Sequence, residues 1–344
     1  MLKFKKRVLK NGLTILFEKR NLPVASIAVA VRAGGINETL EEKGIFHFIE
    51  HMLYKGTKKR DSKKIAEDIE KNGGILNGFT SENVTAYLCK VPDKKIDIAL
   101  DVLGDMIENS VFNIKDIEKE KQVIFEEIKM HKDTPQRYVI DEVHKCLYKN
   151  PFGTDIIGTF ESVGRLNRKK LISVFNSVYS PKNLVLVVVG NVDFEKIVRF
   201  AEKTFKNKNG RLGIQKIQMQ NCYKIEKRKG IDQANMVFAY HVPLFWEKNS
   251  YASKILNTLM AEGASSRLFN EIREKRNLVY AIVGDTEITD KFAYTFIYAG
   301  TKKENVEKVK KLIIEEFEKV AKQLTDKELK QIKEQIIGNY RLSM

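Results

Sequence analysis

The chain has 344 residues, of which 43% are hydrophobic and 31% charged, with a formal net charge of +16 at pH 7. This length allows two domains with hydrophobic cores, and no apolar run reaches the length needed to span a membrane. The N-terminus lacks the apolar segment of a signal peptide. The excess lysines are mixed with glutamates, as in 302–319, which is typical of solvated helix faces. We therefore expect neither a nucleic acid nor a membrane as a partner.

The three cysteines, Cys89, Cys146 and Cys222, are few, widely spaced and odd in number. Such usage is typical of a reducing compartment and favours neither disulfides nor a cysteine-based zinc site. We therefore predict free thiols and a cytoplasmic location.

The first 205 residues alternate between β-rich and helical segments. Asn11-Gly12 predicts a hairpin turn within 7–18. Further strands are predicted from β-rich or continuous apolar runs at 24–34, 75–91 (two strands and a turn) and 183–192. Helices are predicted from 3.6-residue periodicity and capping residues, with Ser62 as one N-cap, at 43–57, 62–74, 96–108, 114–131, 137–148, 169–179 and 193–205.

A polar, glycine-bearing segment at 206–215 is the best candidate for a linker. After it the order strand, loop, helix, strand, helix resumes, and an offset of 213 lays 120–130 over 333–343. We predict an α+β protein with two related α/β sandwich domains, 1–210 and 216–344. Each would have a mixed, largely antiparallel sheet flanked by helices, and the second domain is expected to be incomplete.

The segment HFIEH contains two of the five histidines, His47 and His51, on a predicted helix. Residues four apart lie on one helix face with Cβ atoms about 5–6 Å apart, so both imidazoles can bind one metal ion. Glu50 lies beside them and can take a proton from a metal-activated water. This H-x-x-E-H order is the inverzincin pattern, whereas the simpler alternative is a pair of hydrogen-bonded structural histidines.

A catalytic zinc site needs a third protein ligand. The predicted helix over 114–131 supplies several carboxylates, and the residues alone do not choose among them. Glu127 lies between apolar neighbours and is expected to face inward more than Glu126 does. The candidates are Glu118, Glu120, Glu126 and Glu127.

Several segments together resemble the M16 metallopeptidases, most closely the half-size, processing-peptidase-like branch. They are LKNGLTILFEKR, AGGINETLEEKGIFHFIEHMLYKGT, LNGFTSENVTAYL, EKEKQVIFEEIKM, PFGTDIIGT, YSPKNLVLVVVGNV and SSRLFNEIREKRNLVYAI. The resemblance covers essentially the whole chain. It implies a zinc metalloendopeptidase that cuts short or unfolded peptides in an enclosed chamber. The alternative is a non-catalytic binding or assembly subunit, although such relatives usually lose the H-x-x-E-H motif.

The resemblance also assigns residues that composition leaves open. It implies that Glu127 is the third ligand of one Zn²⁺ per chain and that Glu120 orients a histidine ligand. It further implies that Arg273 and Tyr280 bind the peptide and stabilise developing charge. In half-size members the domain that faces the zinc comes from the partner subunit. Because this chain carries both sets of residues, we expect a homodimer in which Arg273 and Tyr280 complete the partner's site.

The segment LNGFTSENVTAYL resembles the family's substrate-binding edge strand. A peptide would add to this strand through backbone hydrogen bonds, which read extension more than side-chain identity. The residues that the resemblance places at the substrate are Asn77, Gly78, Phe79, Thr80 and Thr85. The physiological substrate and the metal loaded in the cell stay open at this point.

Overall fold

The computed structural model describes residues 3–206, 210, 213 and 215–343. The chain divides into two compact units, Met1–Met130 with Asn150–Lys216 and His131–Lys149 with Ile217–Met344. The sequence predicted a first domain of residues 1–210, which included 131–149. This segment joins the second unit because its helix packs against that unit's sheet. The predicted linker at 206–215 lies largely outside the described residues.

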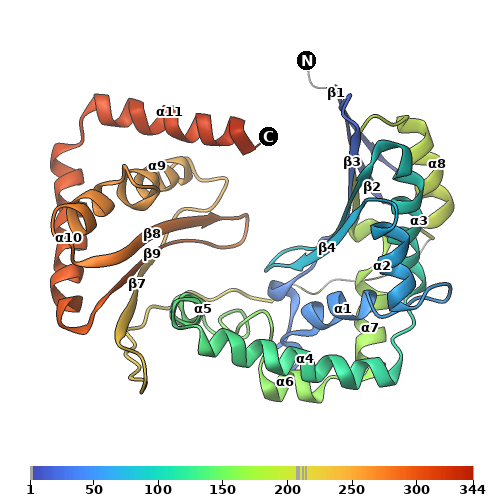
Figure 1. Cartoon of the computed structure of the whole chain (residues 1–344), viewed down its shortest axis with the longest axis horizontal. Helices are drawn as coiled ribbons and strands as arrows, with labels where there is room; N and C mark the ends of the chain where they lie inside the picture. The colour runs from blue at the N-terminus through green and yellow to red at the C-terminus, as the bar shows by residue number, and fades with distance from the viewer. Residues whose placement is uncertain (1–2, 207–209, 211–212, 214, 344) are drawn as a thin grey trace. The chain divides into compact units, whose positions relative to one another are not determined.

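The first unit is built on a six-stranded sheet in the order β1-β2-β6-β3-β5-β4. Figure 1 labels β1, β2, β3 and β4 of this sheet. The β2 and β6 strands pair in parallel, and the other neighbours pair antiparallel. The predicted mixed, largely antiparallel sheet is therefore confirmed. The strands are β1 Lys3–Val8, β2 Thr14–Lys19, β3 Val24–Val31, β4 Ile75–Thr80, β5 Thr85–Pro92 and β6 Leu184–Gly190.

Helices of the first unit follow the predicted positions closely, with two differences. The N-cap of α2 is Asp61 rather than Ser62, because the Asp61 carboxylate accepts the Lys64 N–H at 2.7 Å. The short α6 and the 3-10 segments η1 to η4 were not predicted. The helices are η1 Gly35–Asn37, η2 Leu40–Glu42, α1 Ile45–Leu53, α2 Ser62–Glu70, η3 Asp93–Lys95, α3 Ile96–Asn109, α4 Ile114–Asp133 (which runs into the second unit), α6 Phe160–Arg165, α7 Arg168–Val178, η4 Pro181–Asn183 and α8 Phe194–Thr204.

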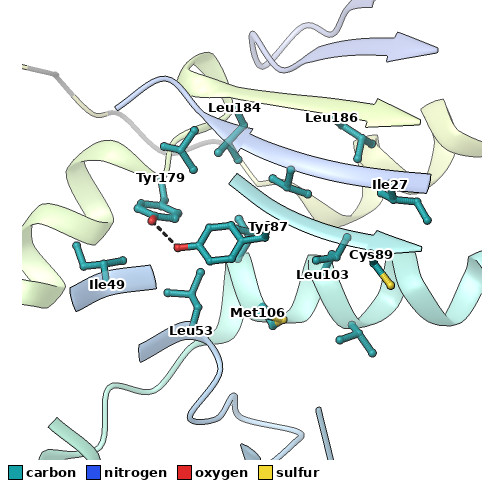
Figure 2. Packing of buried hydrophobic residues seen from close by; sticks show 14 of the residues in the cluster. Ile27, Ile49, Leu53, Tyr87, Cys89, Leu103, Met106, Tyr179, Leu184 and Leu186 are labelled. Carbon is teal, nitrogen blue, oxygen red and sulfur yellow. Dashed lines mark hydrogen bonds between the residues drawn. The ribbon is translucent and has the colours of Figure 1, made fainter. Parts of the chain in front are cut away.

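The core of the first unit joins the sheet to α1 and α3 (Figure 2). Ile49 and Leu53 of α1 point into the same apolar cluster as residues of α3, β3, β5 and β6. Within it the hydroxyl groups of Tyr87 and Tyr179 are 2.7 Å apart and satisfy each other. The helix that carries HFIEH is therefore held by close packing rather than being a mobile surface element.

The second unit has a three-stranded antiparallel sheet in the order β7-β9-β8. This repeats the β3-β5-β4 order of the first unit, and α10 and α11 fall near the positions of α3 and α4 shifted by 213. The structure adds a strand and a helix to the predicted order. The elements are α5 Pro135–Leu147, β7 Gln233–His241, α9 Ser250–Ala261, the π-helical η5 Phe269–Glu274, β8 Val279–Ile288, β9 Ala293–Lys302, η6 Lys303–Asn305, α10 Val306–Gln323 and α11 Asp326–Ser343.

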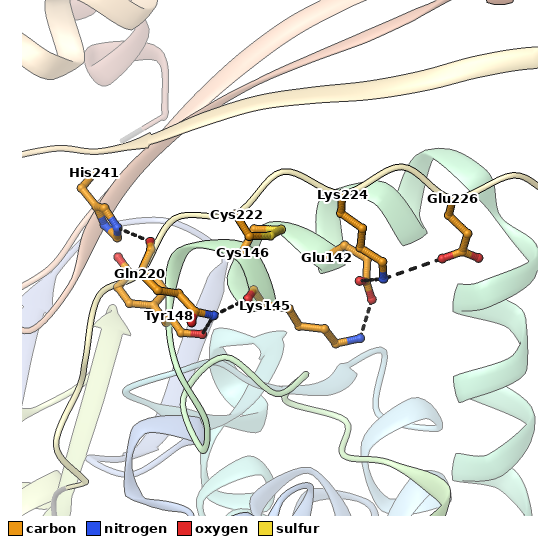
Figure 3. The surroundings of a disulfide bond; sticks show 9 residues. All are labelled: Glu142, Lys145, Cys146, Tyr148, Gln220, Cys222, Lys224, Glu226 and His241. Carbon is orange, nitrogen blue, oxygen red and sulfur yellow. Dashed lines mark hydrogen bonds and ion pairs between the residues drawn. A yellow bond between two sulfur atoms is a disulfide. The ribbon is translucent and has the colours of Figure 1, made fainter.

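A disulfide joins Cys146 of α5 to Cys222 in the segment before β7 (Figure 3). The Gln220 N–H donates to the Leu147 carbonyl at 2.8 Å, which brings this segment against the end of α5. The prediction of free thiols is therefore wrong for these two cysteines. They lie 76 residues apart in the sequence, so their spacing carries no pairing signal. A disulfide is more typical of oxidising compartments, and the cytoplasmic location stays a prediction.

Across the part of the chain that the structure describes, no helix combines the length and the apolar character needed to cross a membrane.

Candidate metal centre

A buried ion pair sets the start of α1. The Glu38 carboxylate accepts the backbone N–H groups of Gly44 at 3.3 Å and Phe46 at 3.0 Å, which are free donors at the helix N-terminus. Lys43 lies 3.4 Å from this carboxylate, and both side chains are fully buried. Burial raises the pKa of the Glu38 carboxyl, while Lys43 acts in the opposite direction. Gly44, at φ +88°, makes the left-handed turn into the helix.

The two histidines of HFIEH project together from α1. The His47 and His51 rings have centroids 4.6 Å apart, as their i, i+4 spacing predicts. Glu127 of α4 completes the group, because its Oε2 lies 3.5 Å from His47 Nε2 and 3.8 Å from His51 Nε2. One ligand atom from each of these three residues lies within 4.8 Å of the others.

This cluster fits a zinc ion. Four ligands at about 2.0–2.2 Å from a tetrahedral zinc lie about 3.3–3.6 Å apart, close to the separations of Glu127 Oε2 from the two Nε2 atoms. Two imidazoles and one carboxylate also form a donor set known from catalytic zinc sites, which keep the fourth position for water or substrate. The other glutamates that the sequence left open do not join the cluster: Glu118 and Glu126 bond to nearby lysines of α4.

Glu120 contacts a histidine of the cluster rather than the metal position itself. Its Oε2 is 3.1 Å from His51 Nδ1, and its Oε1 is 2.6 Å from Lys55 Nζ. Burial alone would raise the pKa of this carboxyl, but the hydrogen bonds to His51 and Lys55 bring it below its usual value. An ionised Glu120 holds the His51 proton on Nδ1 and turns Nε2 toward Glu127. The sequence did not single out Lys55, although it lies four residues after His51 in the helix predicted over 43–57. In the structure α1 ends at Leu53, and Lys55 follows its C-cap, Tyr54.

Glu50 stands beside the cluster without joining it. The Thr80 hydroxyl donates to Glu50 Oε2 at 2.6 Å. Burial raises the pKa of the Glu50 carboxyl; the Thr80 hydrogen bond and His51 act against that shift, and the nearby Glu127 charge adds to it. A raised pKa makes a carboxylate a stronger base, which suits a general base.

The predicted substrate residues occupy β4 and the start of β5. The β4 strand pairs with β5 on one side, and no strand among the described residues pairs with its other edge. Phe79 is 45% exposed, whereas the Asn77 side chain folds back to accept the Gly78 N–H at 2.8 Å. Thr85 is fully buried and donates to a backbone carbonyl, so its side chain does not face a peptide on β4. The Thr80 hydroxyl donates its hydrogen bond to the Glu50 carboxylate.

The remaining two predicted residues belong to the second unit. Arg273 lies on the π-helical segment η5, with its guanidinium 4.7 Å from the Phe269 ring centroid. Tyr280 is 44% exposed near the start of β8, and its hydroxyl lies 3.0 Å from that of the buried Tyr298. The metal cluster and this pair therefore come from different units of the chain.

The sequence did not reveal the Glu38–Lys43 pair. Glu38 lies seven residues before Ile45, the first residue of α1, outside the N-cap and first-turn positions where capping residues are recognised. The contact between Thr80 and Glu50 joins positions 30 apart in the sequence, and nothing in the local pattern indicates it.

Comparison with known proteins shows which family the chain is similar to. The family profile described as Insulinase (Peptidase family M16) matches residues 14–160, and that described as Peptidase M16 inactive domain matches residues 165–336. An uncharacterized zinc protease, YmxG, from Bacillus subtilis is 33% identical over 99% of this chain and 84% of its own length. An uncharacterized zinc protease from Rickettsia felis is also 33% identical, over 96% of this chain and 81% of its own length.

Solved structures share the fold over nearly the whole chain. A protease from Helicobacter pylori superposes with a TM-score of 0.91 at 24% identity, covering 99% of this chain and 85% of its own. A structure described as a peptidase M16 inactive domain, from Pseudomonas fluorescens, gives a TM-score of 0.88 at 19% identity, covering 98% and 84%. The chain belongs to peptidase family M16.

Proposed function

We propose that this protein is a zinc-dependent endopeptidase that hydrolyses short or unfolded peptides. The observation that carries the proposal is the convergence of His47, His51 and Glu127, with Glu50 beside them and free of the cluster. That is the arrangement of three ligands and one base that peptide hydrolysis at zinc requires. The zinc-protease names of the relatives support the same conclusion.

In this proposal the ligands, the base and the residues that orient the ligands have separate roles. A zinc ion held by the three ligands, one ion per chain, would lower the pKa of a water molecule and polarise the peptide carbonyl. Glu50 takes the proton of the attacking water and later passes it to the leaving amine nitrogen. Glu120 and Lys55 keep the His51 ring in its binding orientation.

The peptide is proposed to bind as an added strand on the open edge of β4. Backbone hydrogen bonds would hold it in extended form, so an unfolded segment is accepted and a folded chain is not. The exposed Phe79 would contact a peptide side chain, and Asn77 would contact the peptide backbone. An enclosed chamber around this strand would add selection by size.

Arg273 and Tyr280 are proposed to complete the site of a partner subunit in a homodimer. A guanidinium can hold a peptide carbonyl or carboxylate, and a phenol can donate to a developing oxyanion. Both residues come from the second unit, which also carries the β7-β9-β8 sheet.

The test is cleavage of a quenched fluorescent peptide library by wild type, Glu50→Gln and a chelated sample, with metal content measured for each. We expect Glu50→Gln to retain its zinc but to cut no peptide, and chelation to abolish cleavage reversibly. Glu70→Gln, at the exposed end of α2, is the matched control and should cut as wild type does. A wild type that binds zinc but cuts nothing would favour the alternative, a non-catalytic binding or assembly subunit.

A further inference from the structure

The Glu50 carboxylate is held from the strand on which the peptide is proposed to bind. Thr80 ends β4, pairs with Thr85 of β5, and donates its hydroxyl to Glu50 Oε2 at 2.6 Å. Thr80 was predicted to contact the substrate, but its hydroxyl hydrogen is already directed at the carboxylate. A hydroxyl has one hydrogen to donate, so in this arrangement Thr80 serves Glu50.

The second oxygen of Glu50 faces a part of β4 that has no side chain. A Cβ added to Gly78 would lie 3.3 Å from Glu50 Oε1 and 2.5 Å from the Tyr54 hydroxyl oxygen. The φ angle of Gly78 lies outside the left-handed region, so its backbone conformation does not require glycine. Because Gly78 has no side chain, the space above its Cα is open. Glu50 Oε1 and the Tyr54 hydroxyl oxygen both border this space. Among the described residues the buried Tyr54 hydroxyl has no hydrogen-bond partner there.

We propose that Thr80 is a positioning residue that holds Glu50 Oε2 from the substrate strand. Glu50 Oε1, above the side-chain-free face of Gly78, is thereby left to take the proton of the attacking water. This inference rests on the proposed function, because it assigns a helper to the base of that reaction. It also makes β4 both the binding strand for the peptide and the support of the base, so peptide and base are aligned by one element.

The proton balance of the step is simple. One O–H bond of water breaks and its proton goes to Glu50 Oε1, while the electron pair stays on the oxygen that forms the new bond to the peptide carbon. As that bond forms, the π electron pair of the peptide C=O moves onto the carbonyl oxygen. When this oxygen re-forms the C=O bond, the C–N bond breaks, its electron pair stays on nitrogen, and the same proton moves from Oε1 to the amine nitrogen. Throughout, Thr80 keeps its hydrogen bond to Oε2, which prevents rotation of the carboxylate away from the water.

The first test compares wild type with Thr80→Val, which keeps the branched shape and removes the donor, and Thr80→Ser, which keeps the donor. For Thr80→Val we expect kcat to fall about 10- to 100-fold, the range for losing a hydrogen bond to a charged group. KM and zinc affinity should stay within about threefold, because neither the ligands nor the peptide edge changes. Thr80→Ser should recover most of kcat. A full kcat in Thr80→Val, or an equal loss in Thr80→Ser, would overturn the proposal.

The second test needs no turnover. Urea unfolding of the zinc-loaded protein is measured for wild type, Thr80→Val, Glu50→Ala and the double variant. A hydrogen bond between the two side chains predicts non-additive effects, equal to about a 10- to 100-fold change in the unfolding equilibrium constant. Additive effects would overturn the role of Thr80 even where Glu50→Gln is inactive as expected. An active Glu50→Gln would instead overturn the proposed function and, with it, any role of Thr80 in the reaction.

Discussion

Replacing Glu120 by glutamine should weaken zinc binding without disturbing the fold. Glu120 is 5% exposed, and its two oxygens contact His51 Nδ1 at 3.1 Å and Lys55 Nζ at 2.6 Å. Glutamine keeps the size of the side chain but removes its charge. A hydrogen bond to a charged group contributes about 1.5–3 kcal/mol, and about 1.4 kcal/mol corresponds to a tenfold change in affinity. We therefore expect zinc affinity to fall about 10- to 100-fold.

The assay is a competition titration of metal-free protein against a chromophoric zinc chelator, with thermal unfolding recorded in parallel. Glu126→Gln is the matched control, because Glu126 lies on the same helix and bonds to an exposed lysine instead of a ligand. The control should bind zinc as wild type does. An unchanged zinc affinity in Glu120→Gln, or an equal loss in both variants, would refute the reasoning that Glu120 acts through His51.

Three further predictions concern the buried pair, the subunit arrangement and the pH dependence. Lys43→Met should lower the free energy of unfolding by about 3–5 kcal/mol in urea titrations, because it leaves the Glu38 charge buried without its partner; an unchanged midpoint would contradict this. Mixing Glu50→Gln with Arg273→Ala chains should restore about a quarter of wild-type activity, since half of randomly formed dimers are mixed and each has one intact site; no recovery in dimers that exchange subunits would exclude a shared site. Burial raises the pKa of the Glu287 carboxyl in the folded state, because the charged form is poorly solvated there. The stability present while Glu287 is protonated is therefore lost as pH rises through its folded-state pKa. Glu287→Gln should therefore unfold at higher urea than wild type at about pH 8 and show no gain at about pH 4.

Much of the fold could be read from periodicity and turn residues. The hairpin at Asn11-Gly12 and the strands β3, β4, β5 and β6 lie where their patterns placed them. These signals are local, since each element carries its own turn or cap. The disulfide was missed because it joins helix α5 to a segment that follows the linker, and no local pattern reports such a pairing.

The sequence by itself determined the chemical core of the site. The His47 and His51 rings meet because residues four apart share a helix face, whatever surrounds the helix. The histidine spacing could not choose among the glutamates of α4, because the distance between two helices depends on packing, and it was the resemblance to the M16 family that implied Glu127. Only the tertiary structure decided that Glu127 reaches both Nε2 atoms and that Thr80 holds Glu50, since these contacts join elements that are distant in sequence and are set by the shared core.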